Sequence, residues 1–371
     1  MSVEKIAGHK GLKGPLLLIN NRPLYCGIGE YTYSLYNALR QLLGDEVELL
    51  SWRGELVERL YSKVRERDIL QKFEEAMRVS SQAMFMLKIP KRYALYHVTN
   101  SSLSIVARRV KPCVVTVHDL FPFTSPRDLT DYLIRRSVRA LEHADSIICV
   151  SHSTRNDLLH FLDIDPAMVK VIYEGVNHNL FQPRDKMNSR RILGLPTDKM
   201  LVLHVGSEEP RKNIPTLINA FHELQKEVPE ATLVRVGEKT TAVQRLINSL
   251  ELNDKILYFS DVKDLGCFYN ASDLFAFPSY SEGFGFPPLQ AMASGCPVIA
   301  SNATSIPEVV GDAGILIDPS DTDDFAHWMH EVHVNEELKS RLIRDGIKRS
   351  RAFDWEKCAQ ETLEVYREVM Q

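Results

Sequence analysis

Long apolar runs are absent from this chain. No stretch of about 18 consecutive apolar residues occurs in the 371-residue sequence, so we expect no transmembrane helix. The start of the chain lacks the basic region and the apolar core of a signal peptide. The six cysteines are scattered without a C-x-x-C spacing, which favours buried free thiols over disulfides or a redox motif. These absences predict a protein of the reducing cytoplasm.

A strong charge of either sign is absent as well. The 45 basic and 49 acidic residues give a net charge of −4, whereas a nucleic-acid-binding protein would carry a strongly basic domain. We therefore expect no nucleic-acid partner. Residues 51–139 are the exception, with 17 basic and 9 acidic residues, which suits an anionic acceptor or a peripheral contact at the inner face of a membrane. Residues 83–92 join apolar bulk to three cations and suggest the same contact; the alternative is a core helix that ends in solvated charges.

Strand-like apolar runs alternate with amphipathic helices in two halves of the chain. A polar, proline-containing stretch at residues 175–184 separates the halves. Such alternation predicts an α/β protein with two doubly wound, Rossmann-like parallel-sheet domains that face a cleft. We place the domains at residues 1–180 and 181–350, with a C-terminal helix at 351–371 that packs back toward the first domain. The strands are expected at residues 16–19, 94–98, 113–117, 146–150, 169–173, 200–205, 232–236, 256–259, 274–277 and 298–300.

Residues 281–295 have the composition of an anion-binding turn. The carboxylate Glu282 is followed by a Gly-Phe-Gly sequence, and tandem prolines then mark a helix start. Gly285 lets a ligand approach the backbone, and the N–H groups from Phe284 to Phe286 join the positive end of the helix dipole. The turn follows a predicted strand, where open α/β sheets bind ligands. A diphosphate carrying a hydroxyl-rich group would suit both the N–H groups and Glu282; the alternative is a simple strand-to-helix turn.

Residues 205–213 form a counterpart earlier in the same half. Gly206 lies in the turn, Arg211 can bind phosphate oxygens through its planar fork, and Lys212 adds a point charge. Two cations at the start of a helix oppose its dipole, which indicates that an anion offsets them. The alternative is a solvated basic pair.

The first half offers two further candidates at the ends of predicted strands. Gly27 and Gly29 form a glycine loop, which is either a backbone nest for phosphate or a tight turn. The full dinucleotide-binding fingerprint is missing, because position 32 is Thr32 rather than glycine. His118 follows the apolar run at 113–117 and is expected to point toward the cleft; a structural histidine is the alternative.

These motifs together resemble the retaining, nucleotide-sugar-dependent glycosyltransferases of family 4, which have the GT-B fold. The most specific element is the E-x7-E motif with an intervening Gly-Phe-Gly; here it begins at Glu282, and the amide of Gln290 replaces its second carboxylate. The resemblance covers nearly the whole chain, and the residues that carry it are 26–32, 115–120, 150–153, 205–213, 271–292 and 353–356. The 115–119 and 209–213 variants look most like mannosyltransferase-type members.

The resemblance implies a hexosyltransferase for polysaccharide or glycolipid synthesis. Its donor substrate would be a nucleotide sugar, GDP-mannose or a UDP-sugar, and its acceptor a glycan, a lipid-linked molecule or a small molecule. No cofactor and no metal are implied. The sequence Asp163-Ile164-Asp165 resembles a metal-binding D-x-D motif, but it precedes Pro166 in a polar connection and predicts a turn.

The same resemblance implies a role for each candidate of the phosphate and reaction centre. Gly27 and Gly29 would let the first domain approach the donor diphosphate, and His118 would contact the donor sugar. Arg211 and Lys212 would neutralise the diphosphate.

In the second domain, the resemblance assigns the sugar and ribose contacts. Glu282 would bind the sugar hydroxyls with help from the N–H groups of Phe284, Gly285 and Phe286, while Gln290 would hold the ribose. Ser207 stands where many relatives carry an arginine, which leaves that charge to Arg211.

Two other classes share this fold. A sugar-nucleotide epimerase would need further acid–base carboxylates besides Glu282. A nucleotide-sugar-binding protein without catalysis is suggested by Gln290 alone.

Overall fold

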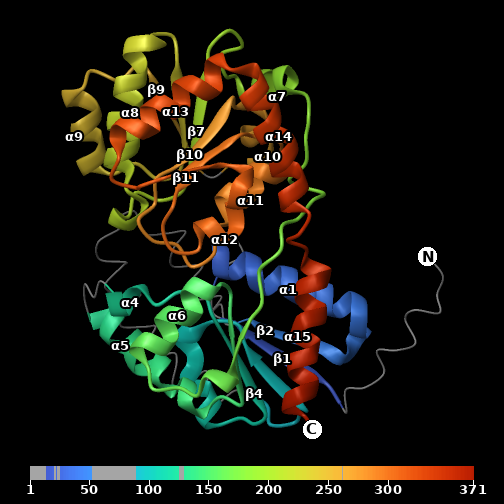
Figure 1. Ribbon diagram of the computed structural model, residues 1–371. Coiled ribbons are helices and arrows are strands. Elements are labelled where there is room, and N and C mark those ends of the chain that lie inside the picture. Colours follow the sequence, from blue (N-terminus) through green and yellow to red (C-terminus); the bar gives the residue numbers. More distant parts are fainter. Residues whose placement is uncertain (1–13, 21, 23–25, 52–88, 125–128, 261) are drawn as a thin grey trace, which may run out of the picture. The chain divides into compact units, whose positions relative to one another are not determined.

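Two six-stranded sheets organise the chain, one in each half (Figure 1). The computed structural model describes residues 14–20, 22, 26–51, 89–124, 129–260 and 262–371. The chain divides into two compact units: residues 1–175 with 355–371 form unit 1, and residues 176–354 form unit 2. All strand pairs are parallel, which confirms the predicted α/β class with two parallel-sheet domains. Most of the predicted membrane-contact segment at 83–92 lies outside the described residues.

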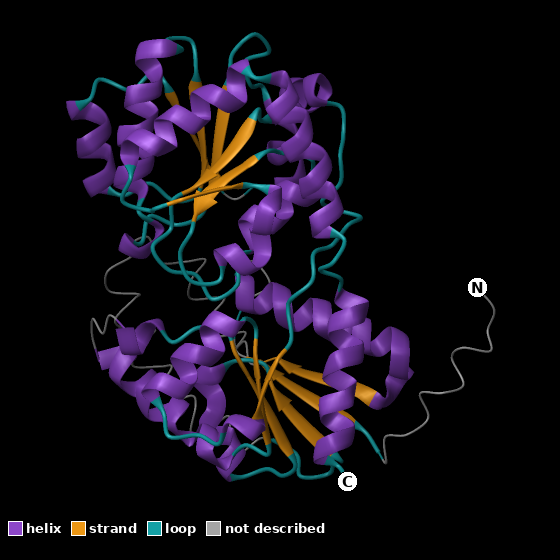
Figure 2. Ribbon diagram, viewed as in Figure 1, coloured by secondary structure: helices purple, strands orange, loops and turns teal. Residues whose placement is uncertain are grey.

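Unit 1 contains the sheet with strand order β2-β1-β3-β4-β5-β6. Every residue of β1, β3, β4 and β5 is buried, as expected for apolar strands that helices cover on both faces (Figure 2). The strands are β1 (Leu16–Asn20), β2 (Val47–Ser51), β3 (Leu95–Val98), β4 (Cys113–Val117), β5 (Ser146–Cys149) and β6 (Val169–Val171). The helices are α1 (Gly27–Leu43), α4 (Phe121–Thr124), α5 (Leu129–Val138), α6 (His152–Phe161) and α15 (Trp355–Val369), with 3-10 helices η2 (Gly44–Glu46), η3 (Ser101–Arg108), η4 (Arg139–His143) and η5 (Pro166–Met168).

Unit 2 contains the sheet with strand order β12-β11-β10-β7-β8-β9. Its strands are β7 (Leu201–Val205), β8 (Thr232–Val236), β9 (Ile256–Phe259), β10 (Leu274–Phe277), β11 (Val298–Ser301) and β12 (Ile315–Ile317). The helices are α7 (Lys186–Leu193), α8 (Ile214–Glu227), α9 (Thr241–Ser249), α10 (Leu265–Ala271), α11 (Phe286–Ala293), α12 (Ile306–Val310), α13 (Thr322–Val334) and α14 (Glu336–Ser350), with 3-10 helices η6 (Pro210–Lys212) and η7 (Gly311–Ala313).

The strand order reverses once within each sheet. The reversal lies between β1 and β3 in unit 1 and between β7 and β10 in unit 2. At such a point the connections leave toward opposite faces of the sheet, and open α/β sheets bind ligands there, outside the carboxyl ends of the strands. The loops that follow β7 and β10 are therefore the first place to look for a site in unit 2.

The C-terminal helix α15 belongs to unit 1 and packs against α1. The Tyr366 hydroxyl lies 2.5 Å from Nδ1 of His97 in β3, and His97 Nε2 lies 2.8 Å from the Thr116 hydroxyl in β4. Burial, with a smaller effect of His118, lowers the pKa of His97 to about 3, so the ring is neutral. A buried polar network thus ties the end of the chain to the sheet of unit 1.

Candidate functional site

The loops after β7 and β10 meet where the strand order of unit 2 reverses. The Tyr280 N–H donates to the Arg211 carbonyl at 2.8 Å, which joins the two loops. Gly206 and Gly237 shape the end of β7 and β8, with φ angles of 147° and 152°. A Cβ on Gly237 would lie 2.2 Å from the Gly206 carbonyl oxygen, so only glycine fits this approach. The predicted turn at Gly206 is therefore part of a tightly packed loop pair.

Two cations share one buried carboxylate in this loop pair. Lys212 Nζ lies 2.6 Å from Glu282 Oε1, and Arg211 Nη1 lies 3.1 Å from Glu282 Oε2. Lys212 and Glu282 are only 8% and 9% exposed. Arg211 Nε also pairs with Glu209, but that carboxylate is half-exposed and therefore screened by solvent. The buried part of the cluster carries one positive charge in excess, and this excess suits an anionic ligand.

The charges of this cluster follow from its burial. Burial alone would raise the pKa of the Glu282 carboxyl, but Lys212 and Arg211 outweigh it and hold that pKa below its usual value. For Lys212, burial lowers the pKa of the ammonium group, and attraction to Glu282 opposes the lowering. Glu282 is thus an anion at neutral pH, and it is the buried carboxylate that the two cations share.

The turn after Glu282 is fixed by the start of α12. Ser305 Oγ donates to the carbonyls of Glu282 and Phe284, at 3.0 and 2.7 Å. Gly285 precedes α11 with a φ of 120°, and a Cβ there would lie 2.9 Å from a side chain of α12. Phe284 is buried and contacts Phe286 edge-on, with ring centroids 5.7 Å apart. The positive end of α11 begins four residues after Glu282 and adds to the excess positive charge.

Gln290 lies on α11 and is almost fully buried. It is 4% exposed, and its Oε1 accepts a hydrogen bond from the Tyr269 hydroxyl at 3.2 Å. A ribose contact through Gln290 stays a prediction.

A buried network beside the cluster escaped the sequence analysis. Arg235, in the middle of the apolar strand β8, is fully buried and contacts His204 in β7. Glu208 Oε1 accepts hydrogen bonds from Arg235 at 3.4 Å and from Tyr258 at 2.9 Å, and its Oε2 accepts from the Thr240 N–H at 2.6 Å. These bonds hold the loop that carries Arg211 and Lys212. The sequence did offer a signal for this network, namely an arginine within an apolar strand. A buried charge needs a partner, so Arg235 predicts a buried ion pair or hydrogen bond nearby.

His118, the candidate of unit 1, follows β4 and is enclosed by protein partners. Its Nε2 lies 2.9 Å from the Thr99 carbonyl oxygen, and its Nδ1 lies 2.9 Å from Glu174 Oε1. His118 is 7% exposed and Glu174 is 1% exposed. Since both ring nitrogens are engaged, a contact with a donor sugar requires the exchange of one bond, and it stays a prediction. Glu174 itself was not identified from the sequence.

Gly27 and Gly29 form the first turn of α1 rather than the expected loop. The Glu30 N–H donates to the Cys26 carbonyl at 2.9 Å, so helical bonding begins at once. Neither glycine has a positive φ. The predicted nest is therefore a helix N-terminus at the carboxyl end of β1, and its phosphate contact stays a prediction.

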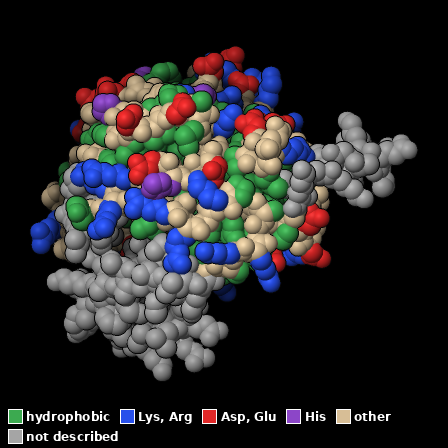
Figure 3. All heavy atoms as spheres, turned by 90° about the horizontal axis from the view of Figure 1, so that it is seen from below, with side chains coloured by type: hydrophobic (Ala, Val, Ile, Leu, Met, Phe, Trp, Pro, Cys, Tyr) green, Lys and Arg blue, Asp and Glu red, His purple; other side chains and the backbone are tan. Residues whose placement is uncertain are grey.

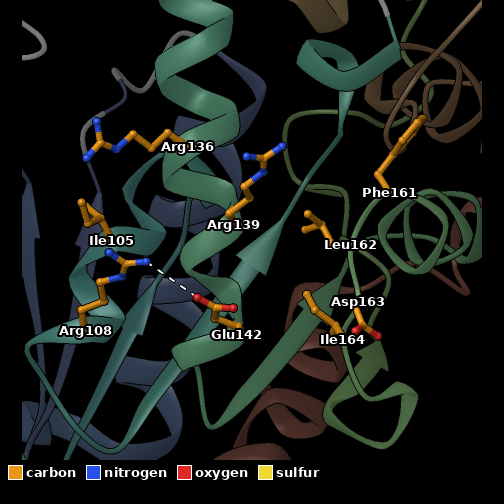
Figure 4. A pocket seen from close by; sticks show the side chains of 9 residues that line it. All are labelled: Ile105, Arg108, Arg136, Arg139, Glu142, Phe161, Leu162, Asp163 and Ile164. Atoms are coloured by element: carbon orange, nitrogen blue, oxygen red, sulfur yellow. Dashed lines mark ion pairs between the residues drawn. The ribbon is translucent and has the colours of Figure 1, made fainter.

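A separate basic pocket lies in unit 1 at the amino ends of β4, β5 and β6. Its volume is about 450 Å³. In Figure 4, the three arginine side chains and Ile105 lie on one side, and Phe161, Leu162, Ile164 and the acidic Asp163 lie on the other. Arg108 pairs with Glu142 at 3.7 Å, whereas Arg136 and Arg139 have no ion-pair partner among the described residues. The lining residues are Ile105, Arg108, Arg136, Arg139, Glu142, Phe161, Leu162, Asp163 and Ile164.

Asp165 of the Asp163-Ile164-Asp165 sequence forms a hydrogen bond with the backbone. Asp165 accepts from the Ala167 N–H at 2.9 Å and caps η5, as the predicted turn requires. Within the described parts of the chain, no three His, Cys, Asp or Glu side chains gather as a metal site. Nor does any helix in these parts have the length and apolar character needed to cross a membrane.

Known protein families match both units. The family described as Glycosyltransferase Family 4 matches residues 25–180, and Glycosyl transferases group 1 matches residues 185–349. The O-antigen chain mannosyltransferase B of Escherichia coli is 30% identical over 285 residues, which are 74% of this chain and 74% of the relative. The chain spans about half or less of the length of some other curated relatives.

Solved structures of the GT-B type share the fold. Sucrose-phosphate synthase from Thermosynechococcus elongatus superposes with a TM-score of 0.76 at 23% identity, over 96% of this chain and 99% of that chain. HepE from Anabaena, in complex with UDP and glucose, has a TM-score of 0.76 at 20% identity, over 95% of this chain and all of that chain.

Proposed function

This chain belongs to the glycosyltransferases of family 4 and group 1, and we propose that it transfers a hexose from a nucleotide-diphosphate sugar to an acceptor hydroxyl. The transfer retains the anomeric configuration and needs neither a metal ion nor a cofactor. The donor is GDP-mannose or a UDP-sugar: a mannosyltransferase among the relatives supports the first, and the complex of HepE with UDP and glucose supports the second. The acceptor is a glycan, a lipid-linked molecule or a small molecule.

The cluster of Arg211, Lys212 and Glu282 carries this proposal. Breaking the bond between the anomeric carbon and the diphosphate places negative charge on the leaving oxygen. Two fixed cations with one shared carboxylate, next to the N-terminus of α11, stabilise that charge without reorganising during the reaction. The acceptor oxygen attacks from the face that the diphosphate leaves, and the departing phosphate oxygen takes the acceptor proton.

The remaining candidates bind and orient the donor. Glu282 hydrogen-bonds the sugar hydroxyls and keeps the two cations in place. Gln290 holds the ribose, and the first turn of α1 at Gly27 and Gly29 approaches the diphosphate. His118 contacts the donor sugar through a ring nitrogen.

An incubation with defined donors tests the proposal. The protein is mixed with GDP-mannose or UDP-glucose and a crude lipid and glycan extract, with and without EDTA. We expect released nucleoside diphosphate and a glycosylated product in both conditions, with the anomeric configuration of the donor by NMR. An isomerised donor sugar would indicate an epimerase, and binding without release would indicate an inactive binding protein. Loss of transfer in EDTA would contradict metal independence.

The basic pocket of Figure 4 supports a peripheral contact with an anionic membrane. On the face drawn in Figure 3, Lys and Arg side chains lie among hydrophobic ones, a combination that suits acidic headgroups. Arg136→Ala/Arg139→Ala should reduce flotation with vesicles of phosphatidylserine, whereas Arg40→Ala, at a paired surface site in the same unit, should not. Equal recovery of the wild type with neutral and anionic vesicles at low salt would rule out the contact.

A further inference from the structure

The surroundings of His118 define where its protons lie. The Thr99 carbonyl can only accept a hydrogen bond, so the His118 Nε2 that lies 2.9 Å from it must carry hydrogen. Nδ1 and Glu174 Oε1 are 2.9 Å apart, and two lone pairs cannot face each other at that distance. One further proton therefore lies between the imidazole and the carboxyl group.

Among the residues that the structure describes, His118 is the hydrogen-bond partner of Glu174. Glu174 is 1% exposed, and burial raises the pKa of its carboxyl, while the hydrogen bond and charge of His118 offset part of that increase. A carboxyl group that is buried to this extent is costly to retain for stability alone. Tyr31 closes another side of the His118 ring, edge-on with centroids 4.7 Å apart.

The backbone around Glu174 is also held. Glu174 is followed by Gly175, the last residue before the chain passes into unit 2. Two residues before Glu174, the Ile172 N–H donates to the Cys149 carbonyl of β5 at 3.0 Å, which ties this backbone to the sheet of unit 1. Glu174 therefore presents its carboxyl group to His118 from a fixed position.

We propose that Glu174 is a positioning residue for sugar transfer: it fixes the orientation of the His118 ring and the tautomer with hydrogen on Nε2. This role rests on the proposed function of His118 at the donor sugar. Without the carboxyl group, Nδ1 has no partner and the ring can rotate or exchange tautomers. Glutamine can replace glutamate in this role, because its amide NH₂ can donate to Nδ1 of the neutral ring.

Nitrogen-15 NMR of the histidine rings tests the geometry without any activity assay. The His118 signals are assigned by comparison with His118→Ala. We expect wild type and Glu174→Gln to show a protonated Nε2, and Glu174→Ala to show averaged ring signals. Either a wild-type His118 with hydrogen on Nδ1 alone, or a Glu174→Ala spectrum identical to that of the wild type, would overturn the proposal. The wild-type spectrum decides even if Glu174→Ala does not fold.

Kinetics then test the link to transfer. We expect Glu174→Ala to lower kcat about 10²-fold, the scale for a misplaced reacting group, and Glu174→Gln to lose about tenfold or less. In a His118→Ala background, neither change should lower kcat further, whereas a purely structural role would lower it equally in both backgrounds. The exposed Glu46→Gln serves as control. Absent transfer in the wild type would refute the proposed function, while the NMR result would still decide whether Glu174 fixes the ring.

Discussion

Replacing Lys212 by methionine should separate catalysis from folding in this protein. Methionine keeps an unbranched apolar stem of similar length and removes the ammonium group. In the wild type, Lys212 Nζ lies 5.2 Å from the centroid of the Phe277 ring. At an effective dielectric constant of about 20, the Coulomb attraction of Glu282 to each cation is about 5–6 kcal/mol at the observed distances. Desolvation costs several kcal/mol per buried ion, so the pairs contribute about as much as they cost.

The expected change in stability is therefore small, within about 2 kcal/mol, because Arg211 still compensates Glu282 in the variant. Transfer should fall by roughly 10²–10³-fold in kcat/KM, which is the usual loss for one charge-stabilising donor. Lys226→Met, at an exposed position on α8, is the matched control and should behave as the wild type.

The assay combines donor kinetics with thermal melting in the presence of GDP or UDP. Ligand binding stabilises the folded protein by an amount that grows with the logarithm of the ligand concentration divided by Kd, so a weaker-binding Lys212→Met should show a smaller rise in melting temperature. If the variant keeps more than about a fifth of wild-type kcat/KM, or loses activity only in proportion to its unfolded fraction, Lys212 does not act on the leaving group.

Three further changes test other parts of unit 2. Glu282→Gln removes the carboxylate that the buried Lys212 and the partly buried Arg211 share, and it should lower the free energy of unfolding by about 3–5 kcal/mol at neutral pH. Because the folded pKa of Glu282 is lowered, its contribution is present above the unfolded value of about 4.3 and lost as the pH falls, so wild-type and variant melts should converge in acid. Gln290→Glu should lower the donor KM about five- to tenfold with little change in kcat; a wild type that transfers nothing and a variant that does would identify an inactive protein instead. Gly237→Ala should destabilise by well over about 1 kcal/mol because its Cβ meets a carbonyl oxygen, whereas Gly194→Ala has a positive φ but open space; equal melting of the two would contradict the steric argument.

The sequence predicts the elements whose own residues carry a recognisable pattern, such as an apolar run or a glycine–proline turn. Ten strands follow from apolar runs, and the α11 turn follows from its glycines and prolines. Two strands, β2 and β12, are not among the ten predicted ones, and β12 is a run of only three residues. Gly27 and Gly29 suggest a loop, and nothing in the sequence shows that residues 27–29 bond helically at the start of α1.

Partners that lie far apart in sequence could not be predicted. Tyr366 reaches His97 across 269 positions, and Glu174 reaches His118 across 56. A composition or a period describes one element, while these bonds depend on which elements the fold brings together. The burial of Arg235 has the same origin, because its partner Glu208 lies in a loop of another strand.

The order of the strands explains why the candidate residues meet in one unit. Glu282 and Lys212 are 70 positions apart, and β8 and β9 intervene in sequence between their strands. Only the direct pairing of β7 with β10 brings the two loops together. If two anion-binding patterns follow different strands and bind one ligand, those strands must be neighbours in the sheet. We therefore expect them at the point where the strand order reverses.

In unit 1 the same reasoning gives a different result. Gly27 follows β1 and His118 follows β4, but β3 lies between these strands. The end of β3 therefore occupies the centre, and it supplies Thr99, whose N–H donates to the carbonyl of Ile19 in β1 at 3.0 Å and whose carbonyl accepts from His118. The backbone after β3 carries no sequence motif, yet it connects the two candidates. A carbonyl can hold a histidine whatever its side chain, so this contact leaves no pattern in the sequence.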